Sequence, residues 1–578
     1  MTKVQVDPIR LELIKNALVS ICDNMMVAVV RTARSTNIKN SMDFSATICD
    51  GQGQLVGQGI AVPAHLGAMM PALRGSLDYF GDDIVDGDIM VSNDPYAGCS
   101  HLNDIFMFKP VFVGGERIGF LCIIIHHTDL GGRVPGGNAT DSGEIFQEGL
   151  RIPASKIWEA GKPNKSILRM IEHNTRIPTR TMGDIYAQIA TLNVAEKDLR
   201  KLVIETGVAE FKVYTQELID YTERLTRAKI AALPDGEAEF TDWNDDDGAG
   251  GPPIKFHVKV IKRGDEFAVD FTGTSPQGRG SMHTNHSFMV SCTYATLRTV
   301  IDRDIPNNAG FFKPITIIAP EGSFVNVRYP AALGARGQGG LRIRSVVFGA
   351  LAQLFPNLIP ACPGGSEFAI VFAGYAGEKR EHFLHLEYHN TSGLGGGPDK
   401  DGQEGGPYCI ANLANVPCEL IEAENPVLVE EYAFLPDSGG AGKYRGALGV
   451  ARQYRLLSDE TTVNLRSDRH LHPCWGLFGG KAGSLSRSIV NPGTDRMEAA
   501  PSKFLRVMNR GDVFRGEFGG SGGYGDPMER DIRLVAEDLK QGKVTVQHAL
   551  EAYGVVAHHG TLKIDMEATR RQRARKAV

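Results

Sequence analysis

Hydrophobic and polar residues recur with different periods along the chain, and each change of period predicts a new element. Residues 43–49 have the pattern of a strand, and residues 50–53 predict a tight turn into a second strand. Before them, Asp7 and Pro8 predict the start of a helix, because the aspartate caps free N–H groups and proline has none to leave unpaired. The helical spacing that follows is carried by Ile9, Leu13, Ile14, Leu18 and Ile21.

Three later stretches extend this picture. The unbroken apolar run IGFLCIII at 118–125 predicts a strand that is buried on both faces. Residues 164–231 are charged and periodic, which is typical of helices. The composition changes at 234–236, Pro-Asp-Gly, and beyond it follow alternating strands, helical stretches and glycine-rich strands. We therefore expect an α+β, multi-domain fold.

The length of 578 residues exceeds what one hydrophobic core usually supports. We expect an N-terminal region of mixed sheet and helices over 1–235, followed by a mixed α/β region over 236–420. A β-rich region with glycine loops should occupy 421–530, and a helical segment should close the chain over 531–578. The middle and late regions are thus expected to be rich in strands.

Composition and charge exclude several classes of function. Hydrophobic residues make up 42% and charged residues 22%, as in soluble globular proteins. The net charge is −6 and no basic stripe is visible, so we expect no nucleic-acid partner. The N-terminus shows no apolar leader, and Asp23 and Asn24 interrupt the apolar stretch 18–30, so we expect no membrane span. Nine cysteines without paired spacing indicate a cytoplasmic protein with reduced thiols.

The residues that suit metal chemistry gather in two loops that follow strands. The first loop, NDPYAGCSHLND at 93–104, is rich in turn formers and holds His101 and Asp104. The second, HHTDLGG at 126–132, ends the buried strand 118–125. Polar residues at the end of a buried strand are typical of the rim of an active site. Imidazole together with carboxylate suits zinc, manganese or iron, so the two loops predict a metal site in the N-terminal region.

The pattern alone leaves the ligand set open. Neighbouring residues of a strand point to opposite faces, so His126 and His127 are not expected to bind one ion together. One of them would be a ligand, and the other would face a substrate or the core. Asp43, at the start of the first predicted strand, can supply a fourth ligand, although nothing local places it near the loop. The alternative is purely structural: a turn held by a hydrogen bond from His101 to Asp104, and a histidine pair that serves the core.

Longer motifs extend the two loops into a family resemblance. They are EGLRIP at 148–153, DFTGTSPQGRG at 270–280, APEGSFVNVRYPAALGAR at 319–336, LPDSGGAGKYRGALG at 435–449 and GGSGGYGDPMER at 519–530. Together these motifs span nearly the whole chain, and several are too long to match by chance. The chain resembles the hydantoinase B/5-oxoprolinase family, which includes N-methylhydantoinase, 5-oxoprolinase and caprolactamase components and is related to acetone and acetophenone carboxylases.

The resemblance implies a ligand set, a metal and a partner. The metal ligands of the family match Asp43, His101, Asp104 and His126, which selects the first histidine of the pair. The metal would be zinc or manganese rather than iron. The partner would be an A-type subunit of actin-like ATPase fold, which binds ATP and magnesium and phosphorylates the substrate. Two copies of each subunit would form a heterotetramer.

The implied reaction is the ATP-dependent hydrolysis of a small cyclic amide, such as a hydantoin, oxoproline or lactam. The sequence has no G-x-x-x-x-G-K-[ST] phosphate-binding loop, which agrees with an ATP site on the partner. We expect His127 or Asp129 to act as general base beside the metal. Two alternatives are an ATP-dependent ketone carboxylase, whose subunits tend to be longer, and a non-catalytic scaffold for the ATPase, which would need no open metal site.

Overall fold

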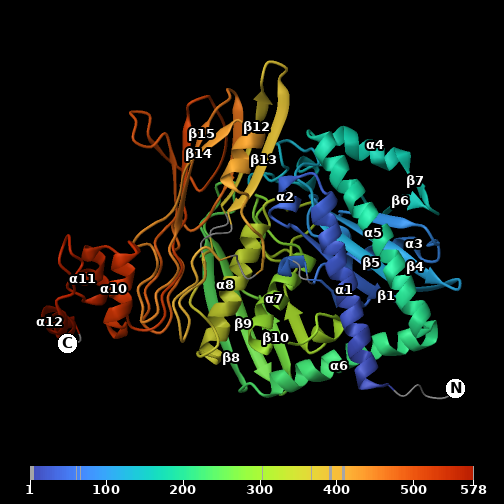
Figure 1. The fold of residues 1–578 in the computed structure, drawn as a ribbon, viewed down its shortest axis with the longest axis horizontal. Helices are drawn as coiled ribbons and strands as arrows, with labels where there is room; N and C mark the ends of the chain where they lie inside the picture. Colours follow the sequence, from blue (N-terminus) through green and yellow to red (C-terminus); the bar gives the residue numbers. More distant parts are fainter. Residues whose placement is uncertain are drawn as a thin grey trace.

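The computed structural model describes residues 6–59, 62–65, 67–302, 304–365, 368–389, 393–406 and 410–576. Within these ranges the predicted α+β, multi-domain architecture is confirmed (Figure 1). Helices accompany four sheets, one of seven strands, one of five and two of four.

A seven-stranded antiparallel sheet dominates the N-terminal region, in the order β2-β1-β5-β4-β3-β6-β7. The interior strand β5 is buried along residues 118–126, as the apolar run predicted. The strands are β1 (Phe44–Asp50), β2 (Leu55–Gln58), β3 (Ile89–Ser92), β4 (Asp104–Val113), β5 (Glu116–His126), β6 (Ser155–Glu159) and β7 (Lys162–Pro163).

Helices α1 (Pro8–Thr32) and α5 (Pro178–Thr206) lie side by side against this sheet (Figure 1). The Asp7 carboxylate accepts a hydrogen bond from the backbone N–H of Ile9 (3.0 Å), which confirms the predicted start of α1. The long helical stretch predicted over 164–231 is also confirmed. The other helices of this region are α2 (Thr36–Lys39), η1 (Pro63–His65), α3 (Met69–Phe80), η2 (Pro95–Ala97), η3 (Ile145–Gln147), α4 (Lys165–Asn174) and α6 (Val208–Ala231).

By length and composition, α1 is apolar enough to cross a membrane, contrary to the expectation drawn from Asp23 and Asn24. In this fold one side of α1 is buried, including Leu18, Cys22 and Met25. This side packs against β1, β2 and α5, as the core helix of a globular domain does. Packing onto the sheet thus accounts for the buried apolar residues of α1, whereas Ile9, Leu13 and Val27 stay exposed.

A mixed four-stranded sheet forms the middle region, in the order β11-β10-β9-β8. Residues of β9 alternate between buried and partly exposed, because only one face of the sheet is covered, by α8. Helices α7 and α8 are among the helical stretches expected beyond residue 236, and Asn285 caps the start of α7. The elements are β8 (Gly236–Asn244), β9 (Ile254–Arg263), β10 (Glu266–Asp270), α7 (His286–Ile301), η4 (Ala309–Phe311), β11 (Ile315–Ile318) and α8 (Gly337–Leu354).

Two further sheets build the late region, in the orders β13-β12-β16-β19 and β14-β15-β20-β17-β18. Both contribute side chains to one hydrophobic cluster, which includes Phe372, Tyr454 and Phe514. The elements are β12 (Phe368–Ala376), β13 (Glu381–His389), α9 (Cys418–Glu424), β14 (Val427–Phe434), β15 (Val450–Leu456), β16 (Thr461–Arg466), β17 (Arg487–Val490), β18 (Glu498–Ala500), β19 (Lys503–Met508) and β20 (Val513–Glu517).

Short helices close the chain at one end of the molecule (Figure 1). They are η5 (Pro527–Glu529), α10 (Ile532–Lys540), α11 (Val546–Tyr553) and α12 (Met566–Lys576). The largest hydrophobic cluster runs from Ile14 to Ile410, so the N-terminal and middle regions share one core. The division of the chain at 235, 420 and 530 stays a prediction.

Candidate metal centre

Asn93 ties the first predicted loop to a neighbouring segment. Its fully buried amide donates hydrogen bonds to the carbonyl oxygens of Leu102 (2.7 Å) and Leu150 (2.9 Å). Its Oδ1 accepts from the backbone N–H of Ile152 (2.6 Å). An amide suits this position because one side chain must both donate twice and accept. The loop is therefore fixed to the EGLRIP motif at 148–153.

Gly98 lets the same loop lie against α3. Its φ of 99° is in the left-handed region, and a Cβ atom there would lie 2.3 Å from the carbonyl oxygen of Pro71. From another side, the side chain of Asn285 donates to the carbonyl oxygens of Pro95 (2.8 Å) and Cys99 (2.7 Å). Elements of two regions thus hold the segment that leads to His101.

The register of β4 and β5 places Asp104 opposite His126. Asp104 begins β4, His126 ends β5, and the two are paired in the antiparallel ladder. Directly paired residues have Cβ atoms about 4.5–5.5 Å apart on the same face of a sheet. The Asn103 side chain also binds the second loop, donating to the carbonyl oxygens of His127 (2.9 Å) and Gly136 (3.1 Å). Strand pairing therefore brings the two loops together.

His101, Asp104 and His126 converge in space. Their possible ligand atoms lie within 4.8 Å of one another, the one such group of three among the residues that the structure describes. The Nε2 atoms of the two histidines are 3.1 Å apart, and His101 Nδ1 lies 2.9 Å from Asp104 Oδ2. Two nitrogens bound to one tetrahedral zinc at about 2.0–2.1 Å would be about 3.3–3.4 Å apart. The histidine separation is close to that value.

One buried atom of this group suits a cation. Asp104 Oδ1 has no hydrogen-bond partner in the described part of the chain. His101 Nδ1 lies beside the Asp104 carboxylate, whereas the other ring nitrogen of His101, Nε2, faces His126. An unpaired buried polar atom costs about 1–3 kcal/mol, so a bound divalent cation would remove a real penalty. Two imidazoles and a carboxylate fit zinc or manganese.

Asp43, the residue before β1, lies close to this group. Its backbone carbonyl accepts the N–H of His126 (3.1 Å), and its Oδ2 lies 4.0 Å from His126 Nδ1. The pairing of β1 with β5 supplies this proximity, which the sequence left open. Asn37 of α2 donates to the carbonyl oxygen of His126 (3.0 Å) and so fixes the end of β5. The structure thus places Asp43 beside His126, although the group of three with ligand atoms within 4.8 Å of one another does not include it. Its role as fourth ligand stays a prediction.

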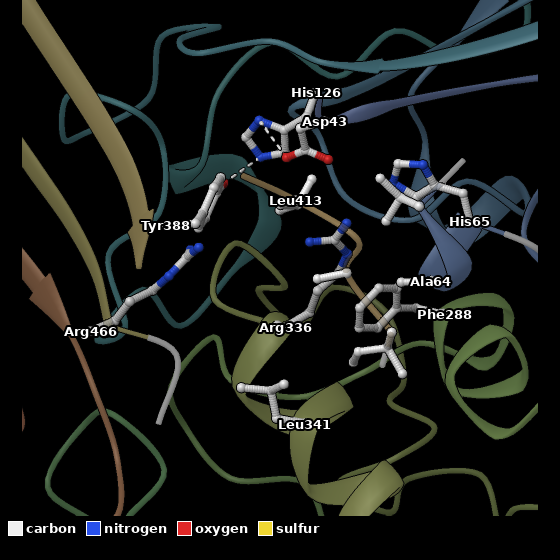
Figure 2. A pocket seen from close by; sticks show the side chains of 14 residues that line it. Asp43, Ala64, His65, His126, Phe288, Arg336, Leu341, Tyr388, Leu413 and Arg466 are labelled. Atoms are coloured by element: carbon white, nitrogen blue, oxygen red, sulfur yellow. Dashed lines mark hydrogen bonds and ion pairs between the residues drawn. The ribbon is translucent and has the colours of Figure 1, made fainter. Parts of the chain in front are cut away.

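A cavity of about 60 Å³ lies beside Asp43 and His126 (Figure 2). Arg336, Tyr388 and Arg466 point toward it from separate elements, and the Tyr388 hydroxyl is 2.8 Å from His126 Nε2. The rest of the lining is mostly apolar and consists of Val62, Ala64, His65, Phe288, Gly337, Leu341, Ile410, Ala411 and Leu413.

Four polar lining residues, His65, Arg336, Tyr388 and Arg466, were absent from the prediction based on sequence. Arg336 ends the motif at 319–336 that contributed to the family resemblance, so a signal existed for it. Tyr388 is 262 positions from His126 in the chain, and no local pattern marks it or Arg466. Only the packing of the late strands against the N-terminal sheet brings them to the cavity.

Burial and nearby positive charge keep the histidines of the site neutral. Burial, assisted by Arg336, lowers the pKa of His101 to about 4. Burial and the neighbouring His101 lower the pKa of His126 well below its usual range. Burial alone would raise the pKa of Asp104, but His101 and Arg336 outweigh it and hold this pKa well below its usual value. Neutral imidazole and ionised carboxylate are the forms that bind metals.

His127 and Asp129 are not part of the cavity lining. The buried His127 ring places Nε2 3.2 Å from Gln188 Oε1 of α5. The Asp129 carboxylate pairs with the Arg176 guanidinium (2.9 Å) and accepts backbone N–H groups of Arg176 (2.7 Å) and Gly136 (2.9 Å). These contacts give both residues partners within the fold. Their predicted role as general base stays a prediction.

The sequence profile of the hydantoinase B/oxoprolinase family matches residues 7–527. This chain belongs to that family. One relative is a putative B-type subunit of a D-/L-hydantoinase from Pseudomonas sp. (strain NS671), 30% identical over 98% of this chain and 98% of its own length. The caprolactamase β subunit of Pseudomonas jessenii is also 30% identical, over 98% of this chain and 99% of its own length.

Solved structures agree with this hydantoinase B assignment. The crystal structure of ATP-dependent caprolactamase from Pseudomonas jessenii matches with a TM-score of 0.92 at 29% identity, over 99% of this chain and 100% of that chain. A nucleotide-free structure of acetone carboxylase reaches the same TM-score at 19% identity, over 99% of this chain and 83% of that chain, and shows a shared fold. The resemblance inferred from the motifs is thus confirmed.

Proposed function

We propose that this chain is the metal-binding subunit of an ATP-dependent hydrolase that opens a small cyclic amide, such as a hydantoin, oxoproline or lactam. The observation that carries the proposal is the buried group of His101, Asp104 and His126 in a chain that matches a caprolactamase β subunit from end to end. Asp43 would complete the ligand set. Zinc or manganese is the metal that this donor set favours.

An ATPase partner would supply the energy for the reaction. Two relatives are named as the B or β component of an enzyme, which supports a second subunit, and this chain carries no phosphate-binding loop of the G-x-x-x-x-G-K-[ST] type. We infer an A-type partner of actin-like fold that binds ATP and magnesium, in a heterotetramer with two copies of each subunit. We place the complex in the cytoplasm, where the cysteines would stay reduced.

The proposed chemistry divides between the two subunits. Resonance protects an amide, and phosphorylation of its oxygen by the partner would make the carbon more electrophilic. Water would then attack this carbon, the ring C–N bond would break, and the nitrogen would take up a proton, which leaves an acyl phosphate. A second water would hydrolyse the acyl phosphate to the free carboxylate and inorganic phosphate. A divalent cation held by His101, Asp104, His126 and Asp43 would lower the pKa of a bound water and polarise a substrate oxygen.

The residues of this chain would orient the substrate. Arg336 donates a hydrogen bond to the Asp104 carboxylate and keeps it ionised. The Tyr388 hydroxyl, beside His126, is placed to donate a hydrogen bond to a substrate atom in the cavity. Phe288 and Leu341 would exclude water from the ring. His127 or Asp129 remains our proposal for the base; full turnover with metal intact in both His127→Ala and Asp129→Ala would refute it.

The test is a reaction with the purified complex. This chain, the ATPase subunit, ATP and metal are incubated with a panel of hydantoins, lactams and ketones, and ADP and ring-opened products are measured. We expect ADP release coupled to ring opening, and His101→Ala should abolish both the opening and the bound metal. His257→Ala on β9, a partly exposed residue with no contact to the site, is the matched control. Bicarbonate-dependent ketone consumption without ring opening would instead support the carboxylase alternative.

A further inference from the structure

The polar residues of the cavity include two arginines that the proposed metal site does not use as ligands. We propose that Arg336, Arg466 and Tyr388 form a subsite for the dianionic phosphoryl group of an O-phosphorylated substrate, with Arg466 as the specificity-determining residue. This inference rests on the proposed function, because the ATPase partner would produce the phosphorylated species. It assigns the recognition of that species to named side chains of this chain.

Arg336 is held at the metal group. Its Nε donates to Ser100 Oγ and its Nη2 donates to Asp104 Oδ2. These two contacts orient the planar guanidinium, whose head points toward Asp43 and His126 in Figure 2. Arginine suits a phosphoryl group because its N–H groups form a rigid fork that matches two oxygens.

Arg466 approaches the cavity from the end of β16. Its side chain is buried, its Nη1 donates to the carbonyl oxygen of Gly334 (3.0 Å), and its guanidinium lies 5.1 Å from the centre of the Tyr388 ring. Stacking on an aromatic ring orients a guanidinium without using its donors. Figure 2 shows its head beside Tyr388, across the cavity from the metal group.

Glu148 fixes the backbone segment that carries Arg336 and accepts a hydrogen bond from Arg466. Its buried carboxylate accepts the backbone N–H groups of Leu333 (2.9 Å) and Gly334 (2.5 Å). The segment 333–336 carries Arg336 at its end and offers the Gly334 carbonyl oxygen to Arg466. Arg336 therefore lies on this segment, and Arg466 of β16 is hydrogen-bonded to it.

The charged side chains of the lining favour a dianion. Among the lining residues that the structure describes, two carry a guanidinium group, Arg336 and Arg466, and one carries a carboxylate, Asp43. A bound divalent metal would add further positive charge. A phosphoryl group carries about −1.5 to −2 near neutral pH and offers more charge and more acceptor oxygens to the two guanidinium groups than a monoanion does.

The size of the cavity agrees with a group rather than a whole substrate. Its volume of about 60 Å³ holds a few water molecules, since one water needs roughly 10–15 Å³ measured in this way. An oxyanion head fits this space beside Arg336 and Tyr388. Phe288 and Leu341 form an apolar wall of the same space.

Calorimetric titration of inorganic phosphate into the metal-loaded full chain tests the subsite without the partner. We expect Arg466→Gln to weaken phosphate binding about tenfold or more with metal content unchanged, the scale of one charge-assisted hydrogen bond. Arg466→Lys keeps the charge but loses the fork and should bind with intermediate affinity, and it serves if the glutamine variant does not fold. Arg506→Gln, which removes an exposed pair with Glu498, is the matched control and should bind like the wild type.

The two proposals fail in different ways. Equal phosphate affinity of the wild type and both Arg466 variants, or no phosphate binding by the wild type at millimolar phosphate, would overturn the subsite even if the complex opens cyclic amides. Bicarbonate binding as tight as that of phosphate would also overturn the preference for a dianion. Phosphate binding that depends on Arg466, in a complex that opens no cyclic amide, would support the subsite and refute the proposed reaction.

Discussion

Replacing Asn93 with alanine should release the loop that leads to His101. The change removes three buried hydrogen bonds, those to the carbonyl oxygens of Leu102 and Leu150 and that from the N–H of Ile152. A neutral hydrogen bond contributes about 0.5–1.5 kcal/mol net, so three contribute roughly 1.5–4.5 kcal/mol. Because about 1.4 kcal/mol corresponds to a factor of ten, opening of the loop should become roughly 10- to 1,000-fold more frequent.

Amide hydrogen exchange measures this opening peptide by peptide. Peptides that cover 93–104 and 148–153 should lose protection in Asn93→Ala, while peptides from β12 and β13 should keep theirs. Bound metal should fall in parallel, since the loop ends in two of the proposed ligands. Asn16→Ala, which loses one exposed hydrogen bond to Glu12, is the control. Unchanged exchange in both loop peptides would show that Asn93 does not hold the loop, and the reasoning from its contacts would be refuted.

Three further predictions follow from buried contacts. Gly98→Ala should lower the melting temperature more than Gly114→Ala, because both positions have positive φ but only Gly98 faces a carbonyl oxygen at 2.3 Å; equal losses would contradict this. A chelator should lower the melting temperature of the metal-loaded wild type but not of Asp104→Asn, since a bound ligand stabilises only a fold that binds it; an equal shift in both would remove Asp104 from the ligand set. Burial alone would raise the pKa of Asp468, but the positive charges of Lys503 and Arg342 lower this pKa to about 2. The Asp468 carboxylate therefore stabilises the fold above about pH 4, and this contribution is lost as the pH falls toward 2. Asp468→Asn should therefore cost about 3–5 kcal/mol in denaturant unfolding at pH 7 and flatten the acid dependence, whereas exposed Asp459→Asn should change neither.

Several features of this protein were determined by the sequence alone. The start of α1 at Asp7, the buried strand β5 and the turn-rich loop 93–104 all depend on interactions between residues that are near in the chain. Capping, side-chain period and turn chemistry act over a few residues, so they are visible in a single sequence. The pairing of His101 with Asp104 belongs to this class, because both lie in one loop.

Only the tertiary structure decided how the site is completed. Asp43 meets His126 because β1 pairs with β5, and Tyr388 meets it because β13, far along the chain, packs over the same edge. Arg336 and Arg466 converge through a segment held by Glu148. Such contacts depend on strand register and on the packing of separate sheets, which no local period encodes. The sequence therefore determined which loop holds the candidate metal ligands, and the packing of distant strands decided which charged and aromatic side chains surround them.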